Sequence, residues 1–206
     1  MPLMPARSPL DADTILTATE EILRRHGPDK ATVVDVARAL GVTHAAVYKH
    51  FASKQALREA VTRRWLDRNR DTLAVLAADR TVPPARRLRA WLHAVLAVKQ
   101  AKIREDPELF AAYGILAAAH STVATDHVAD LLGQLAAIIA DGAADGSFRT
   151  GDAAATARVV FHATAKFNHL AHAAEWQNPG IGGELDEVCS LLLEGLQSPA
   201  SATNKE

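Results

Sequence analysis

The spacing of the apolar residues constrains the fold more than any other feature of this sequence. Large apolar side chains recur at intervals of three and four through segments rich in Ala. That interval is the period of one face of an α-helix, and Ala is the strongest helix former. Alternating patterns, which are typical of strands, are scarce. The sequence therefore predicts an all-α protein, for which we expect about nine helices.

Composition narrows the class of protein. The chain has 206 residues, 49% of them apolar, and a net charge of −1, which excludes a disordered acidic tail. Its one cysteine, Cys189, excludes an internal disulfide framework and Cys-rich metal sites, and it fits a reducing cytosol. The longest apolar runs, such as 135–140, are far shorter than the ~18 residues of a membrane span. We therefore expect a cytoplasmic protein with no signal peptide and no membrane span.

Capping and helix-breaking residues divide the N-terminal third into short helices. Side chains that can accept from the first backbone amides of a helix occur at four places, Asp11 or Asp13, Thr32, Thr43 and Ser53. Residues that end helices follow at Gly27-Pro28, Gly41 and Pro83-Pro84. We expect the fourth helix to run as one continuous rod from Lys54 towards Ala78.

Turn residues divide the rest of the chain. They separate predicted helices near 85–104, 107–120, 122–145, 153–177 and 183–197. We expect an N-terminal domain over 10–53, a connecting helix and linker over 54–82, and a helical bundle over 83–198.

The segment from Thr32 to Phe51, TVVDVARALGVTHAAVYKHF, has the residue sizes that two helices crossing at a tight turn require. Ala37 is small where the helices must approach closely, and Gly41 can adopt the left-handed conformation of the turn. The shared core would consist of Val36, Leu40, Val42 and Val47. This pattern predicts a helix-turn-helix.

Charge is unevenly distributed along the chain. Residues 30–64 carry a net charge of +5, whereas residues 67–206 carry −4. A charge cluster alone is commonly just a solvated face. Here it coincides with the predicted helix-turn-helix, as phosphate neutralisation by Lys and Arg requires. We therefore expect double-stranded DNA as a partner.

These residues resemble the TetR family of transcriptional regulators. The resemblance covers about residues 11–65 and is carried by Thr32-Val33-x-Asp35-Val36-Ala37-x-x-x-Gly41-Val42-Thr43-x-x-x-Val47-Tyr48-x-His50-Phe51-x-Ser53-Lys54-x-x-Leu57. It implies a three-helix DNA-binding head, a fourth helix that transmits motion, and a helical body that binds a small molecule and dimerises through its last two helices. The body matches more loosely, through Phe148, 169–176 and Pro179-Gly180.

The resemblance also implies the DNA-binding residues. It places on the recognition helix Thr43, His44, Ala45, Val47, Tyr48, Lys49 and His50, and at the DNA backbone Thr32 and Lys54. Hydroxyl and ammonium groups can donate to phosphate, whereas short side chains suit base edges. The sequence departs from the family at His44 and Ala46, which implies fewer bidentate base contacts. We expect Val47, with Phe51 and Leu57, also to belong to the core.

Eight residues of the body are candidate ligand contacts: Trp91, Phe110, Tyr113, His162, Lys166, His169, His172 and Trp176. The predicted helix 153–177 would place most of the polar ones on one stripe. Three interpretations stay open. The stripe is a solvated or dimer-rim face, a polar wall of a ligand pocket, or a metal site built from His169 and His172 with His120 or His127.

The last predicted helix suggests a homodimer. Its apolar side chains exceed what a single core contact needs: Leu185, Val188, Leu191, Leu192 and Leu196. The sequence contains no GxSxG, P-loop, GxGxxG, HExxH or CxxC pattern, so we expect neither an enzyme nor a cofactor. We expect a repressor that binds a palindromic operator and is released by a small-molecule effector. The alternatives are a metal-binding or enzymatic helical bundle, and a DNA-binding dimer without a ligand.

Overall fold

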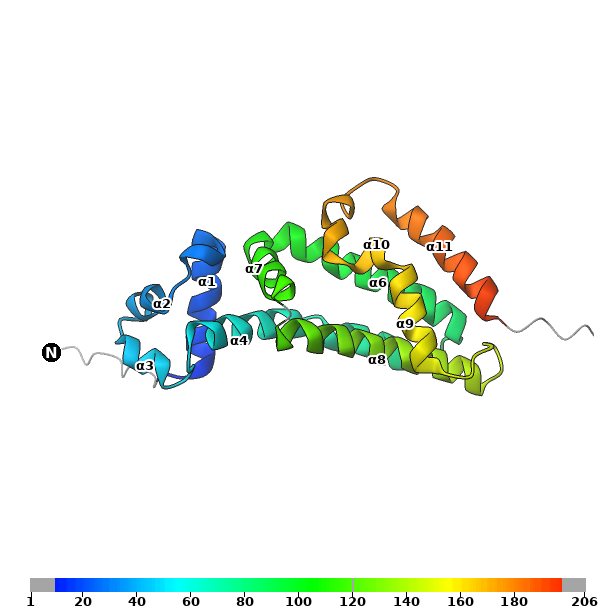
Figure 1. Ribbon diagram of the computed structural model, residues 1–206, viewed down its shortest axis with the longest axis horizontal. Coiled ribbons are helices and arrows are strands. Elements are labelled where there is room, and N and C mark those ends of the chain that lie inside the picture. The colour runs from blue at the N-terminus through cyan, green and yellow to red at the C-terminus, as the bar shows by residue number, and fades with distance from the viewer. Residues whose placement is uncertain (1–9, 120, 198–206) are drawn as a thin grey trace, which may run out of the picture. The chain divides into compact units, whose positions relative to one another are not determined.

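The structure is a computed structural model that describes residues 10–119 and 121–197. Within these residues it contains helices and no strand, which confirms the all-α prediction (Figure 1). The α-helices are α1 (Ala12–Lys30), α2 (Val33–Leu40), α3 (His44–Tyr48), α4 (Lys54–Asp67), α5 (Arg70–Ala78), α6 (Pro84–Glu105), α7 (Pro107–Ala118), α8 (Thr122–Ala144), α9 (Ala153–Ala163), α10 (Ala165–Asn168) and α11 (Ile181–Leu196). A 3₁₀ helix, η1 (Leu170–Glu175), precedes α11.

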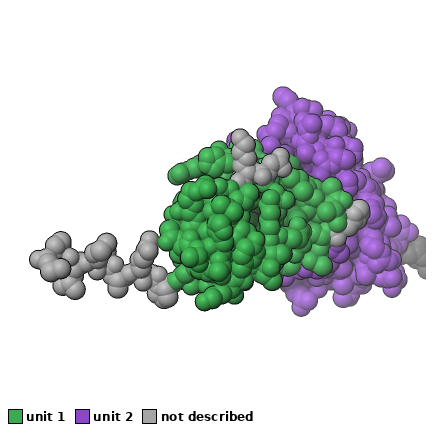
Figure 2. All heavy atoms as spheres, turned by 60° about the vertical axis from the view of Figure 1, so that its left-hand side comes forward, with its two compact units in different colours: residues 1–66, 106–124 green, residues 67–105, 125–206 purple. Residues whose placement is uncertain are grey.

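The chain divides into two compact units (Figure 2). Unit 1 comprises Met1–Leu66 and Asp106–Ala124, and unit 2 comprises Asp67–Glu105 and Thr125–Glu206. Unit 1 therefore includes α7, although the helices that flank α7 in the sequence belong wholly or mostly to unit 2. Each unit thus consists of two separate segments, which a division of the chain into consecutive domains cannot represent.

Local hydrogen bonds begin the N-terminal helices where the sequence predicts. The carboxylate of Asp11 accepts from the Thr14 amide at 2.7 Å, and this bond lowers the pKa of Asp11. Thr43 accepts from the Ala46 amide at 3.2 Å, and Ser53 accepts from the Ala56 amide at 3.0 Å. Each bond satisfies an amide that has no partner within its helix. Within α1, Gly27 adopts a φ of 74° and bends the chain at the predicted breaker.

The predicted rod from Lys54 to Ala78 is wrong, because the helix breaks into α4 and α5. Asn69 has a φ of −110° and a ψ of 2°, which lie outside the helical region. The break falls in a polar stretch over 67–70, where Asn and Asp favour non-helical conformations and no apolar stripe continues across.

The single helix predicted over 153–177 is also wrong. It is replaced by α9, α10 and η1. At the first break the Thr164 hydroxyl donates to the Val160 carbonyl at 2.9 Å, and the Asn168 amide group donates to the carbonyls of Phe161 and Thr164, both at 3.0 Å. Such side-chain bonds compete with the helical ladder. The His and Lys residues of this segment therefore do not share one face of one helix.

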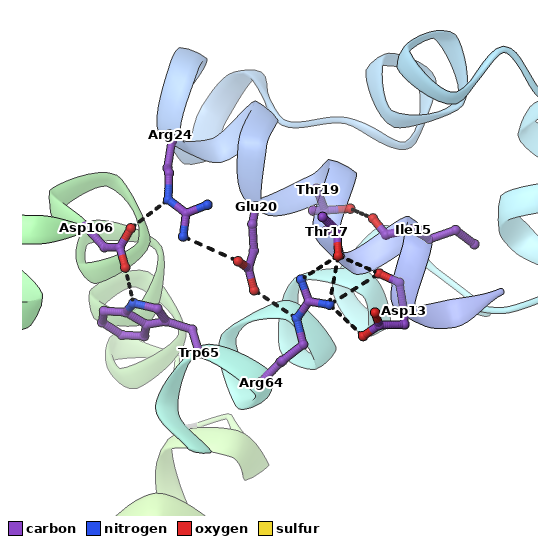
Figure 3. A network of polar contacts seen from close by, with 9 residues as sticks. All are labelled: Asp13, Ile15, Thr17, Thr19, Glu20, Arg24, Arg64, Trp65 and Asp106. Carbon is purple, nitrogen blue, oxygen red and sulfur yellow. Dashed lines mark hydrogen bonds and ion pairs between the residues drawn. The ribbon is translucent and has the colours of Figure 1, made fainter. Parts of the chain in front are cut away.

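Unit 1 has an apolar core crossed by a polar network. Its fully or almost fully buried side chains include Ile15, Leu23, Val36, Val47, Leu57 and Trp65. Beside them Arg64 donates to Glu20 at 2.9 Å and to Asp13 at 2.8 Å (Figure 3). Asp106 accepts from Arg24 at 2.6 Å and from the indole of Trp65 at 3.1 Å. The network thus joins α1 to α4 and both helices to the start of α7.

Unit 2 is built around α6 and α8. Its fully buried side chains include Leu88, Trp91, Leu135, Ile138, Ile139 and Leu185. The buried guanidinium of Arg87 donates to the Ala77 carbonyl at 3.1 Å and to Asp141 at 2.9 Å. By length and composition alone, α8 is apolar enough to cross a membrane, but it carries buried core residues of this unit. Core helices of globular proteins commonly share that composition.

We predict that Glu20→Ala lowers the free energy of unfolding by about 2–3 kcal/mol. The substitution removes a buried carboxylate, so the Arg64 guanidinium loses one of its hydrogen-bond acceptors. The side chain of Glu20 is only 4% exposed, whereas that of Asp13, another partner of Arg64, is 82% exposed. Asp13→Ala is therefore the matched control and should change stability by less than about 0.5 kcal/mol. Urea titrations followed by circular dichroism measure the free energy of unfolding of both variants. Equal losses would contradict the assignment.

Candidate nucleic-acid interface and ligand-binding residues

The turn between α2 and α3 has the geometry that the sequence predicts. Gly41 has a φ of 63° and a ψ of 37°, in the left-handed region that glycine adopts without strain. Its amide donates to the Arg38 carbonyl at 3.1 Å, and the Val42 amide donates to the Ala37 carbonyl at 2.9 Å. These bonds close α2 and turn the chain directly into α3, so the two helices form a helix-turn-helix.

One face of α3 is exposed. The exposed residues at and beside this short helix include most of the predicted DNA-binding set: Thr43, His44, Ala45, Tyr48, Lys49, His50 and Lys54. Tyr48 is 47% exposed although it is aromatic. Val47 is 0% exposed and packs in the core of unit 1, as the sequence predicts, so its side chain is not part of the exposed face. Burying Val47 fixes which face of α3 points outward.

Thr32 caps α2, as the sequence predicts. Its hydroxyl accepts from the Asp35 amide at 3.2 Å and donates to the Asp35 carboxylate. This bond is the main cause that lowers the pKa of Asp35. Because the single hydroxyl proton already serves Asp35, Thr32 could donate to a phosphate only by giving up that bond. Its place at the start of α2 is therefore explained by capping.

The positive charge available on the surface is smaller than the sequence count suggests. Arg64 is engaged by Glu20 and Asp13, and Arg58 donates to the carbonyl of Pro28. Lys49 and Lys54 are exposed beside and beyond α3. These two ammonium groups are thus the best placed of the counted cations to meet a polyanion.

A groove that the sequence did not indicate lies between α1 and α2. It has a volume of about 750 Å³, and its lining includes the basic side chains of Arg25, His26 and Arg38. Arg38 forms an ion pair with Asp35 at 3.0 Å but remains 74% exposed. The ion pair could have been predicted from the sequence, because residues three apart lie side by side on a helix.

The candidate ligand residues are divided between the two units. Phe110 and Tyr113 belong to α7 in unit 1, whereas the other six belong to unit 2. Trp91 is fully buried, and its indole donates to Gln134 at 3.0 Å. Trp176 is also fully buried, and its indole donates to the Lys166 carbonyl at 2.8 Å.

The polar members of that set lie at the surface. His162 and His169 are exposed. Lys166 forms an ion pair with Glu184, which raises the pKa of Lys166, and His172 contacts Glu175 at 2.9 Å, which lowers the pKa of Glu175. Within 10–119 and 121–197 no group of three His, Cys, Asp or Glu residues could hold a metal ion, and His120 lies outside the described residues.

The structure brings together in unit 2 a buried lysine and a half-buried histidine, which the sequence did not indicate as a pair. Lys99 is only 8% exposed, and burial lowers its pKa to about 8. Burial and the nearby charges of Lys99 and Lys102 lower the pKa of His127 to about 3. The available signal was the position of Lys99 in α6, four residues after Val95 and three after Leu96, on the apolar face.

We predict that Val47→Ala lowers the free energy of unfolding by about 2 kcal/mol, because it removes buried methyl groups and leaves a cavity. The matched control is Tyr48→Ala, at the exposed neighbouring position, which should change stability by less than about 0.5 kcal/mol. Urea unfolding monitored by helicity separates the two. A larger loss for the Tyr48 variant would show that α3 is rotated from the orientation described.

Comparison with protein families gives two matches. Residues 84–189 match the model of the tetracyclin repressor-like C-terminal domain, and residues 15–61 match that of the bacterial regulatory proteins of the tetR family. Together they cover most of α1, all of α2 and α3, the first part of α4, and the chain from α6 into α11. The first match alone spans half of the chain.

Individual relatives agree with these matches. An uncharacterized HTH-type transcriptional regulator from Mycobacterium tuberculosis is 33% identical over 105 residues, which are 51% of this chain and 50% of that protein. The chain thus matches about half the length of this curated relative. A TetR transcriptional regulator from Streptomyces coelicolor is 26% identical, with a TM-score of 0.51, and the match covers 92% of this chain and 100% of that one.

A third relative shows the shared fold alone. The FadR repressor from Thermus thermophilus, solved in complex with lauroyl-CoA, is 20% identical with a TM-score of 0.63. The match covers 94% of this chain and 99% of that chain.

Proposed function

Because the chain belongs to the TetR family of transcriptional regulators, we propose that it is a cytoplasmic repressor that binds a near-palindromic DNA operator as a homodimer. A small-molecule effector bound by the C-terminal domain would release it from DNA. The observation that carries the DNA-binding part is the exposed face of α3 beside Lys49 and Lys54, held outward by the buried Val47.

The exposed side chains divide into two roles at a duplex. His44 and Ala45, at the start of α3, have the short reach that suits base edges in the major groove. Lys49 and Lys54 are flexible point charges that would pair with phosphates and set the position of the head. The Tyr48 hydroxyl would add a third backbone contact.

We predict that Lys49→Ala and Lys54→Ala each weaken binding to all DNA sequences, because each removes one phosphate contact. Each should lower the slope of log affinity against log salt by about one. His44→Ala should instead alter sequence preference. Fluorescence anisotropy titrations at several salt concentrations measure these slopes.

The matched control is Arg158→Ala, which removes an exposed cation from α9 in the other unit and should leave the slope unchanged. Unchanged slopes for both Lys variants would contradict the assignment of these residues to the DNA backbone.

Exposed apolar side chains on the last helices support the proposed dimer. Leu191 on α11 is 71% exposed, and Val159 on α9 is 63% exposed. Other apolar side chains of α11 face the core of their own unit, including Leu185 and Leu193. Pairing of such a face with its twin would bury it in a two-fold interface. The two recognition helices would then have to lie about 34 Å apart, or a multiple of that, to fit one side of a duplex.

We predict that Leu191→Glu converts the dimer to a monomer at micromolar concentration, because it places two charges in a desolvated contact. Val75→Glu is the matched control, since Val75 is also an exposed apolar residue, 70% accessible, but lies on α5. Sedimentation velocity gives the mass of each. A wild-type protein that sediments as a monomer would remove the dimer from the proposal.

The effector part of the proposal is supported by FadR, whose structure holds lauroyl-CoA within the same fold. Release follows from linkage: an effector that favours a body conformation with wrongly spaced heads lowers DNA affinity, and DNA lowers effector affinity equally. In this chain α7 is well placed to report such a change. It is bonded to α1 through Asp106 and Arg24, and its sequence neighbours α6 and α8 belong wholly or mostly to unit 2.

A further inference from the structure

The most unusual polar group of unit 2 is the buried ammonium of Lys99. The residue is 8% exposed and lies on the same face of α6 as the buried Val95 and Leu96. Within 10–119 and 121–197 no carboxylate forms an ion pair with it. A buried cation without an anion is costly, and proteins normally pair or neutralise it.

The surroundings of Lys99 are positive or aromatic rather than acidic. Its ammonium lies 5.4 Å from the ring centroid of Trp176, which attracts a cation weakly through the ring face. The charges of Lys99 and Lys102 both act on the half-buried His127. Three basic side chains from α6 and α8 are thus close enough to influence one another. The missing element in this arrangement is a negative charge.

Trp176 is held firmly in this arrangement. Its indole donates to the Lys166 carbonyl at 2.8 Å, and its own carbonyl accepts from the Gln100 side chain at 2.6 Å. Gln100 is the neighbour of Lys99 in α6. The same turn of α6 therefore carries the Lys99 ammonium and, through Gln100, holds the backbone of Trp176. The aromatic wall beside the ammonium is therefore pre-formed, which reduces the entropy lost when a ligand binds.

From this arrangement we infer that Lys99 binds the carboxylate of the effector, a small monocarboxylic acid with an apolar body that packs beside Trp176. A single negative charge matches the single ammonium of Lys99, whereas the other buried cation of unit 2, Arg87, is already paired with Asp141. The apolar body follows from the neighbours of Lys99 on α6 and from the Trp176 ring. This inference rests on the proposed effector-binding role of the C-terminal domain.

Thermal unfolding of the full chain tests the inference with matched pairs of probes. The acids are butanoate, hexanoate, octanoate, benzoate and phenylacetate, and each is compared with its primary amide, which has the same shape without the charge. At ten times its dissociation constant, a bound acid should raise the midpoint by about 2–4 °C. The amide at the same concentration should raise it by less than a quarter of that shift. Equal responses to acid and amide, or no response to any acid, would overturn the inference.

Variants locate the response. Lys99→Met keeps the length and apolar stem of the side chain but removes its charge, and it should abolish the difference between acid and amide. Arg104→Met removes an exposed cation from the same helix and should keep the difference. A full response in the Lys99 variant would overturn the inference. If that variant does not fold, the acid and amide comparison on the wild-type protein decides alone.

DNA binding separates this inference from the proposed function. Without acid, both variants should bind DNA within twofold of the wild-type affinity, because neither residue belongs to unit 1. A protein that binds DNA but does not distinguish acids from amides retains the proposed DNA-binding function and loses this inference. A protein that responds to an acid but never binds DNA loses the proposed function and keeps a carboxylate site at Lys99.

Discussion

The tight crossing of α2 and α3 is the constraint on which the DNA-binding face depends. Gly41 turns the chain through a left-handed conformation, and Ala37, which is 1% exposed, leaves room for the next helix to approach. Once Val47 is packed into the core, the helical period determines which neighbours point outward. The exposed face of α3 is therefore a consequence of packing. No other interaction is needed to expose its polar side chains.

A second constraint is the polar network that crosses unit 1. It joins residues distant in the sequence, since Asp106 lies at the start of α7 and its partners Arg24 and Trp65 lie in α1 and α4. The bond from the Trp65 indole is part-buried, whereas the bond from Arg24 is exposed. A displacement of α7 would preserve or break bonds to both α1 and α4.

The sequence was informative where structure is decided locally. The caps at Thr43 and Ser53 and the turn at Gly41 follow from the chemistry of a few adjacent residues, and the structure has all of them. The helix breaks near Asn69 and Thr164 were not predicted. At Thr164 the reason is that apolar spacing is insensitive to side-chain bonds that compete with the backbone hydrogen bonds of the helix.

The candidate sites show the same division. Charge counted along the sequence included Arg64, whose guanidinium is turned inward to Glu20, and only the tertiary structure reveals this. The burial of Lys99 was likewise not predicted, because a single Lys on an apolar helix face most often extends its charge to solvent. By contrast the exposed residues of α3 could be identified from the motif and the helical period alone.

The central claim is that α3 is presented to a DNA duplex by a symmetric dimer. Selection of bound duplexes from a random oligonucleotide pool by the full chain tests it most directly. The account predicts an enriched near-palindrome whose two half-sites are separated by one helical turn, about 34 Å, or a multiple of it. A pool without enrichment, or one enriched in solitary half-sites, would contradict it.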